Sequence, residues 1–178
     1  MDRDLWVFGY GSLMWNPEFP FTAREVAVLT GFARTFCMSS IHHRGTPDAP
    51  GLVLALEETP GATCTGVVYR VAAADADAVL AQVRDRELIS SAYVERHLPV
   101  TLASGEARTA LVYVIEKDHP QYVGGMPLER QASIIASAVG GRGPNDEYLF
   151  NTVAHLDQLG IEDADLAWLA SRVRRLAA

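Results

Sequence analysis

One stretch near the N-terminus decides how this chain is interpreted: Leu5-Trp6-Val7-Phe8-Gly9-Tyr10-Gly11-Ser12-Leu13-Met14-Trp15. Its first half is an apolar, strand-like run that stops at two glycines flanking Tyr10. Glycine permits turns with positive φ and a close approach of the backbone to a ligand. A strand that ends in this way can aim consecutive backbone N–H groups at one point, which suits an anion such as a carboxylate. The alternative is a simple turn after a strand.

The spacing of these glycines excludes the common nucleotide-binding motifs. A dinucleotide fingerprint requires a third glycine three residues after the second, where this chain has Met14. A P-loop requires Gly-Lys-Ser/Thr, and no lysine is nearby. Met14 also breaks the Gly-x-Ser-x-Gly pattern of a nucleophilic serine, and nothing local marks a partner base for Ser12. The loop therefore indicates an anion site without a nucleotide-binding fold.

Length and composition indicate one globular domain over residues 1–178. Hydrophobic residues make up 49% of the chain and charged residues 21%, which is normal for a protein with a core. The net charge of -7 argues against a nucleic-acid partner and against anionic membranes. We expect no signal peptide, and no run approaches the roughly 18 apolar residues of a membrane span. These features predict a cytoplasmic protein, and they leave the oligomeric state open.

The cysteines and histidines give no sign of a metal site. Cys37 and Cys64 lie in apolar or strand-like surroundings and are expected to be reduced core residues. The five histidines are scattered, and none has HExxH or CxxC-type spacing around it. We therefore expect neither a structural nor a catalytic metal.

Strand-like segments dominate the first two thirds of the sequence. They cover residues 5–10, 24–39, 52–57, 64–71, 93–102 and 107–116. Gly31 can kink or bulge the second segment. Thr59-Pro60-Gly61 predicts a turn between the third and fourth segments, and Ser104-Gly105 predicts a hairpin between the last two. Residues 42–51 are expected to form a loop.

Helical patterns occupy residues 73–86 and the last third of the chain. One helix is expected to open at residues 126–129 and to close at Gly140 and Gly141. Another is capped by Asn145 or Asp146 and runs to about residue 159, and the last begins at Asp163. This order predicts an α+β fold, with a mixed, mainly antiparallel sheet, closed or half closed, and helices packed outside it.

One acid is a candidate for chemistry. Glu87 ends the first helix, and a carboxylate at a helix-to-strand junction can point into a cleft. The alternative is a solvated surface acid. Tyr93 and Tyr148 can contact a ligand or be amphipathic residues half in the core. The loop around Arg44 can hold an anion or be a solvated turn.

Taken together, these features resemble the ChaC-type γ-glutamylcyclotransferases. The resemblance begins with the quoted stretch and the following Pro17-x-Phe19-Pro20, and it covers roughly residues 5–175 without large gaps. Further matches occur in order: His43-Arg44-Gly45-Thr46-Pro47, Pro50-Gly51, Gly66-Val67-Val68-Tyr69-Arg70, Arg86-Glu87, Tyr93, Tyr122-x-Gly124, Pro127-Leu128-Glu129 and Asn145-x-Glu147-Tyr148-Leu149-Phe150. The chain departs from many members at Ser91-Ala92-Tyr93, where they have Gly-Gly-Tyr, and at Cys37, where an aromatic residue is common.

The resemblance implies a small mixed barrel with flanking helices and an enzyme that cleaves glutathione to 5-oxoproline and cysteinylglycine. It implies that Glu87 is the catalytic residue and that no metal, nucleotide or redox cofactor is needed. We expect these substrate-binding residues: Val7, Phe8, Gly9, Tyr10, Gly11, Ser12, Leu13, Tyr93 and Tyr148. Two alternatives are the same chemistry on another γ-glutamyl amide or peptide, and a non-catalytic protein that binds γ-glutamyl compounds.

The implied reaction makes a structural prediction about Glu87. The α-amine of the substrate attacks its own γ-carbonyl, so the protein supplies orientation and proton transfer. The ordinary pKa is about 4.3 for a glutamate and about 8 for an α-amine. This difference in pKa opposes proton transfer from the α-ammonium group to the glutamate by roughly 5 kcal/mol. Burial raises the pKa of a carboxyl and narrows this gap. We therefore expect Glu87 to be largely buried and close to the loop of residues 10–13.

Overall fold

The computed structural model describes residues 3–88 and 91–177. It divides into two compact units, Met1–Arg34 with Leu56–Glu116, and Thr35–Ala55 with Lys117–Ala178. Two long strands, β2 (Ala23–Ser40) and β3 (Gly51–Val71), run through both units. The expectation that residues 1–178 form a single domain stays a prediction.

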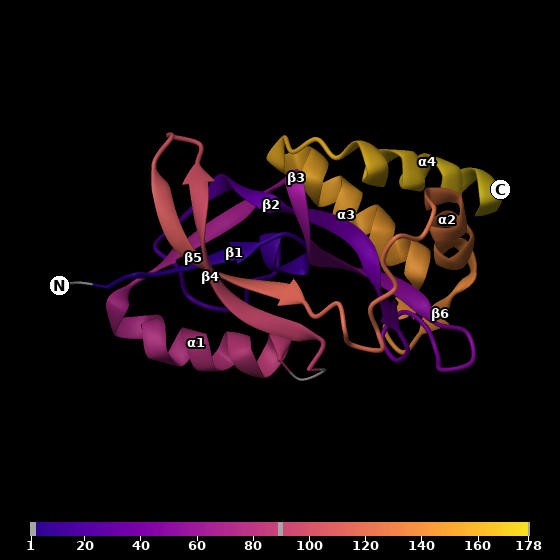
Figure 1. Ribbon diagram of the computed structural model, residues 1–178, viewed down its shortest axis with the longest axis horizontal. Coiled ribbons are helices and arrows are strands. Elements are labelled where there is room, and N and C mark those ends of the chain that lie inside the picture. Colours follow the sequence, from indigo (N-terminus) through magenta and orange to yellow (C-terminus); the bar gives the residue numbers. More distant parts are fainter. Residues whose placement is uncertain (1–2, 89–90, 178) are drawn as a thin grey trace. The chain divides into compact units, whose positions relative to one another are not determined.

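The first unit contains most of a closed five-stranded barrel with the strand order β1-β3-β2-β4-β5 (Figure 1). The strands β1 (Leu5–Gly9), β4 (Tyr93–Leu102) and β5 (Ala107–Ile115) complete the set. β1 is antiparallel to β3, and β5 is antiparallel to β4. β1 closes the barrel by a parallel pairing of Val7 with Leu111 of β5. The predicted α+β fold with a mixed, mainly antiparallel barrel is confirmed.

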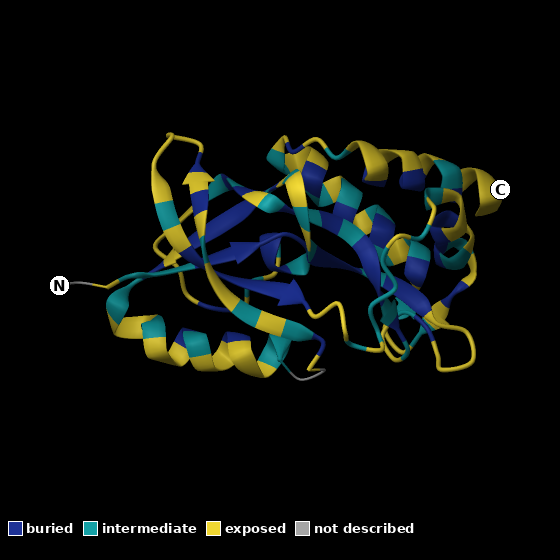
Figure 2. Cartoon of the chain, in the orientation of Figure 1, coloured by how far each residue is buried: buried dark blue, intermediate teal, exposed yellow. Residues whose placement is uncertain are grey.

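The strands of the barrel carry runs of buried residues (Figure 2), and most of these residues are apolar. Val7 and Phe8 of β1 are completely buried, and so is the run of β5 from Ala110 to Leu111. Burying an apolar side chain of this size stabilises a fold by about 1.5–3 kcal/mol. The end of β1 is thus held at a defined place, which positions the residues that follow it.

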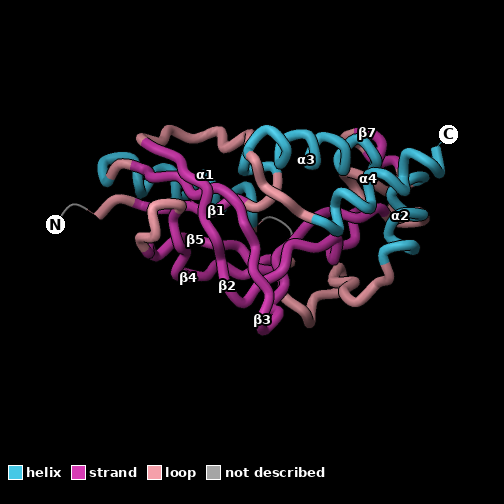
Figure 3. The backbone as a smooth tube through the Cα atoms, turned by 90° about the horizontal axis from the view of Figure 1, so that it is seen from above, coloured by secondary structure: helices cyan, strands magenta, loops and turns pink. Residues whose placement is uncertain are grey.

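Helix α1 (Ala73–Glu87) lies against the outside of the barrel (Figure 3). Val79 and Val83, four residues apart, form its buried face, while most of its other side chains are exposed. The Nε and Nη2 atoms of Arg84 donate hydrogen bonds of 2.9 Å to the two carboxylate oxygens of Glu95, and these bonds join the helix to β4. The C-terminal turn of α1 is therefore attached to the barrel.

The second unit contains the helices α2 (Leu128–Ser137), α3 (Asn145–Leu159) and α4 (Ala164–Ala177) and a small sheet of β6 (Val139–Gly140) and β7 (Gly143–Pro144). α2 packs against both α3 and α4. Apolar side chains of α4 occupy its buried face: Leu166, Leu169, Ala170 and Val173. Asp163 caps α4, because its Oδ1 accepts a hydrogen bond from the Leu166 N–H at 3.1 Å.

Three local predictions were wrong. No turn forms at residues 59–61, since β3 is continuous through them and Gly61 lies within the strand with a φ of 85°. Gly140 and Gly141 do not end a helix, because α2 stops at Ser137 and Gly140 pairs with Gly143. Asn145 does not cap α3. Its side chain bonds to the N–H and C=O of Leu52, at 2.8 Å each.

Candidate active site

The loop after β1 folds back tightly on the strand that precedes it. Residues 12–14 form a single 3₁₀ turn, Ser12–Met14. A Cβ atom at Gly9 would lie 2.9 Å from Cβ of Leu13, and one at Gly66 of the neighbouring strand would lie 2.3 Å from the Gly9 carbonyl oxygen. Such contacts are too close for any side chain. Both glycines are therefore needed because backbone and side chains approach them closely.

Buried donors hold the carbonyl groups of this loop. The Tyr69 hydroxyl lies 2.7 Å from the carbonyl oxygen of Leu13 and 2.8 Å from that of Met14, and it shares its proton between them. Burial raises the pKa of Tyr69, so the hydroxyl stays protonated as a donor. Arg34 Nη1 donates to the carbonyl oxygens of Tyr10, at 3.2 Å, and Thr65, at 2.9 Å. The loop is anchored through its oxygen atoms.

Three N–H groups of the same loop differ from its carbonyl groups in having no partner within the described protein. Within residues 3–88 and 91–177, the backbone N–H groups of Gly11, Ser12 and Leu13 have no protein acceptor. In this loop, carbonyl groups are hydrogen-bonded to the barrel and these N–H groups have no protein acceptor. This arrangement is expected of a loop that binds an anion. This agrees with the interpretation of the two glycines as part of an anion site.

Glu87 is largely buried, as predicted. It is the last residue of α1, and its side chain is 16% exposed. Burial raises the pKa of this carboxyl, and the positive charge of Arg86 opposes that rise. The Nε atom of Arg86 lies 3.6 Å from Oε1 of Glu87. The alternative of a solvated surface acid is therefore wrong.

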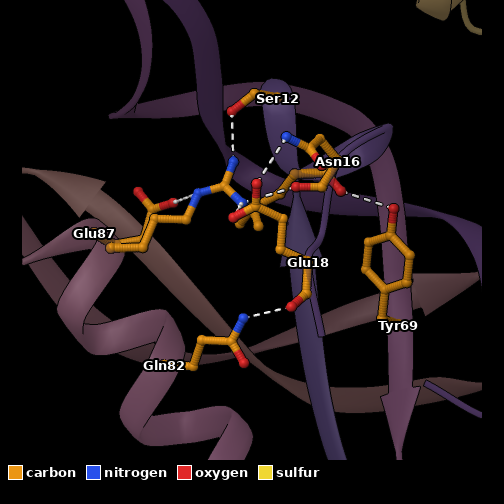
Figure 4. Close-up of polar contacts among 8 residues, drawn as sticks. Ser12, Asn16, Glu18, Tyr69, Gln82 and Glu87 are labelled. Carbon is orange, nitrogen blue, oxygen red and sulfur yellow. Dashed lines mark hydrogen bonds and ion pairs between the residues drawn. The ribbon is translucent and has the colours of Figure 1, made fainter. Parts of the chain in front are cut away.

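Arg86 joins Glu87 to the loop (Figure 4). Its Nη2 donates to the Ser12 hydroxyl at 3.0 Å, and its Nη1 donates to the carbonyl oxygen of Asn16 at 2.7 Å. Figure 4 shows Ser12 and Glu87 reaching the same guanidinium from different sides. Glu87 and the residue 10–13 loop thus meet around one cation.

A second contact from α1 holds the segment after the loop. Gln82 Nε2 donates to the carbonyl oxygen of Glu18. The backbone of Glu18 is left-handed at this point, with a φ of 61°. Gln82 and Arg86 are four residues apart and so face the same way on the helix. The sequence interpretation missed the role of Arg86. The (i, i+4) pair of polar side chains beside the candidate acid was the signal that could have found it.

The other expected site residues are placed as follows. Val7 and Phe8 are completely buried, so their side chains belong to the barrel core. Tyr93 is the first residue of β4 and lies opposite Ile115 of β5. Their parts in substrate binding stay predictions.

Tyr148 belongs to the second unit and is described there by itself. Its hydroxyl accepts a hydrogen bond from the Leu54 N–H at 3.2 Å, and its ring makes an edge contact with Phe36 at a centroid distance of 6.0 Å. The Arg44 guanidinium lies 5.7 Å from the centre of the Tyr148 ring and donates to the Pro144 carbonyl oxygen at 3.1 Å. The side chain of Arg44 is only 14% exposed, so the loop of residues 42–51 is packed at this point rather than solvated.

The described residues show no sign of a metal cluster or a membrane span. Within residues 3–88 and 91–177, no three His, Cys, Asp or Glu side chains are grouped so that they could hold a metal ion. No described helix is both long enough and apolar enough to cross a bilayer. Cys37 and Cys64 are both buried, as expected, and no disulfide joins them within the described residues.

Among solved structures, the fold resembles that of a yeast γ-glutamyl cyclotransferase specific to glutathione. The TM-score is 0.86 at 27% sequence identity, and the match covers 97% of this chain and 96% of the yeast chain. The barrel, the loop after β1 and the helices thus define the class of the protein, which has a γ-glutamylcyclotransferase-like α+β fold.

The sequence assigns the family within that class. Residues 5–176 match the family of ChaC-like proteins, and this chain belongs to it. It is 37% identical to the glutathione-specific γ-glutamylcyclotransferase of Escherichia coli strain K12, over 98% of this chain and 74% of that protein. It is 36% identical to the γ-glutamylcyclotransferase 2-3 of Arabidopsis thaliana, over 97% of this chain and 89% of that protein.

Proposed function

We propose that this protein is a γ-glutamylcyclotransferase that cleaves glutathione to 5-oxoproline and cysteinylglycine, with Glu87 as general acid and base. The observation that carries the proposal is the largely buried Glu87 carboxylate, joined through Arg86 to the loop after β1. The names of the relatives support glutathione as the substrate. The match of one family to residues 5–176 supports a single functional domain.

The reaction needs no nucleophile from the protein. The α-amine nitrogen of the γ-glutamyl group forms a bond to its own γ-carbonyl carbon, and the bond from that carbon to the cysteine nitrogen breaks. Holding the arm in this bent shape can supply several kcal/mol of the barrier, because attack within one molecule avoids the entropy of bringing two together. The loop N–H groups of Gly11, Ser12 and Leu13 suit the α-carboxylate or the oxyanion of the tetrahedral intermediate.

Glu87 balances the protons. The α-ammonium nitrogen loses two protons as it becomes the lactam N–H, and the cysteine nitrogen gains two as it becomes an ammonium group. A single carboxylate that takes each proton from one nitrogen and gives it to the other accounts for both transfers. The raised pKa of Glu87 reduces the free-energy gap between it and the amine.

The direct test is release of 5-oxoproline. Purified protein is incubated with glutathione and with a panel of γ-glutamyl dipeptides, without added metal or nucleotide, and 5-oxoproline is followed by chromatography. Turnover of glutathione above the other compounds supports the proposal. Turnover of another γ-glutamyl compound alone would favour the same chemistry on a different substrate, and the absence of 5-oxoproline from every compound would leave only a binding protein.

We also infer a cytoplasmic location, with a small molecule rather than a nucleic acid or a membrane as partner. The net charge of -7 supports the choice of partner, because nucleic acids and anionic membranes would be repelled. The two buried cysteines, which no disulfide joins within the described residues, are compatible with a reducing compartment. Cell fractionation, with the protein recovered in the membrane pellet, would contradict it.

A further inference from the structure

The Arg86 side chain makes four contacts around the candidate site, and none of them was expected from the sequence. It donates to the Ser12 hydroxyl and to the Asn16 carbonyl oxygen, and it lies 3.6 Å from Glu87 and 3.8 Å from Glu18. Its side chain is 26% exposed. A guanidinium offers donors in a planar fork, which lets one side chain hold several groups in fixed directions at once.

This geometry decides how the Ser12 hydroxyl is used. A guanidinium has no acceptor, so the oxygen of Ser12 must accept the 3.0 Å hydrogen bond from Arg86. A hydroxyl carries one proton of its own and two lone pairs. The proton of Ser12 is therefore left to donate, and a γ-glutamyl oxygen bound by the loop is an acceptor of the right kind.

The same cation faces Glu87. Arg86 of α1 interacts electrostatically with that carboxylate, and so does Tyr113 of β5, which also interacts with Glu95 of β4 and Arg84 of α1. Glu95 is already paired with Arg84 and accepts a hydrogen bond from Tyr113 at 2.8 Å. Arg86 is thus the cation in direct contact with Glu87, and it favours the ionised form that can accept a proton.

We propose that Arg86 is a positioning residue of the γ-glutamyl site, which sets the Ser12 hydroxyl as a donor toward a substrate oxygen and holds the Glu87 carboxylate beside the loop that contains Ser12. The proposal deepens the proposed function and rests on it. It separates two tasks of one side chain: the fork geometry serves Ser12, and the charge serves Glu87.

Two variants separate these tasks. Arg86→Lys keeps the charge and loses the fork, so we expect the KM for glutathione to rise about tenfold with the acidic limb of kcat/KM unchanged. Arg86→Gln loses both the charge and the fork. We therefore expect a similar rise in KM, and the acidic limb of the kcat/KM profile should shift about one unit to higher pH. The matched control is Arg108→Lys, since Arg108 pairs with Glu106 beside the β4–β5 hairpin turn. It should leave KM and the pH profile as they are in the wild type.

A double-mutant cycle tests whether Arg86 acts through Ser12. If it does, Arg86→Lys should raise KM by less than about threefold in a Ser12→Ala background, because the group that Arg86 orients is already gone. Equal effects in both backgrounds would overturn the Ser12 part of the proposal. An unchanged pH profile in Arg86→Gln would overturn the Glu87 part.

One measurement does not depend on turnover. The pKa of the Glu87 carboxyl can be followed by NMR in the wild type, Arg86→Lys and Arg86→Gln proteins, with folding checked by circular dichroism. We expect a rise only in Arg86→Gln, and equal values in all three would contradict the proposal. If wild-type protein releases no 5-oxoproline yet this pKa pattern appears, the proposed function fails while the Arg86–Glu87 coupling stands.

Discussion

The Oε1 atom of Glu87 lies 3.6 Å from Nε of Arg86, the residue before it in the chain. Two opposing effects therefore act on one carboxyl: burial raises its pKa and the neighbouring cation lowers it. Burial is the larger effect. A base that titrates above the usual range of a glutamate is suited to exchanging protons with an amine, because the difference in proton affinity between them is smaller.

Replacement of Glu87 by glutamine should abolish turnover and spare binding. Removing a general acid and base typically costs about 10²–10⁴-fold in rate. We expect a loss of this size in kcat for 5-oxoproline release. Glutathione should still bind in calorimetry, because the loop N–H groups are untouched. Glu106→Gln, at an exposed position beside the hairpin, is the control. A Glu87→Gln protein with normal kcat would contradict the assignment of the base.

The same substitution predicts a pH dependence of stability. A carboxyl with a raised pKa in the folded state contributes stability that is present at low pH and is lost as the pH rises through that pKa. The wild type should therefore lose stability relative to Glu87→Gln between about pH 4 and neutral pH. Thermal unfolding of both proteins across this range measures the difference. A constant difference in free energy of unfolding would show that the Glu87 pKa is the same in both states.

A methyl group at Gly9 should damage the loop. The Cβ atom of Gly9→Ala would lie 2.9 Å from Cβ of Leu13, and the loop has to shift to relieve the contact. We expect a loss of about 1–3 kcal/mol in the free energy of unfolding, as for other overpacked sites. Urea titration gives this value. Activity should fall more than stability alone explains, since the N–H groups of Ser12 and Leu13 move. Unchanged stability and activity would refute the close-approach argument.

Truncation of Asn145 should destabilise the second unit. This residue has no exposed surface, and its side-chain amide holds both polar backbone groups of Leu52. Asn145→Ala leaves a buried N–H and a buried C=O without partners, which we expect to cost about 2–4 kcal/mol. Asn151→Ala, at an exposed position of the same helix, is the control. Equal melting temperatures for the two variants would show that water replaces the Asn145 side chain as the partner of the Leu52 N–H and C=O groups.

Local patterns predicted the elements whose stability comes from nearby residues. The strand ending at the first glycine, the helix ending at Glu87 and the hairpin at Ser104-Gly105 all form close to the predicted positions. Each has its own periodicity or turn residues. The predictions failed where distant parts of the chain compete for the same groups. The Asn145 side chain bonds to Leu52, 93 residues away, instead of capping its own helix.

The sequence by itself determined most of the element types, the family motifs and the single acid worth testing, because these depend on residue identity and short spacing. Only the tertiary structure decided how that acid is held. Arg86 and Ser12 are 74 residues apart, and they meet because the barrel positions the end of β1 while α1 packs on its outside. Burial of Glu87 is likewise a property of the folded surroundings, which no pattern of neighbouring residues specifies. The loop and the base were therefore recognisable separately, and the cation that joins them was not.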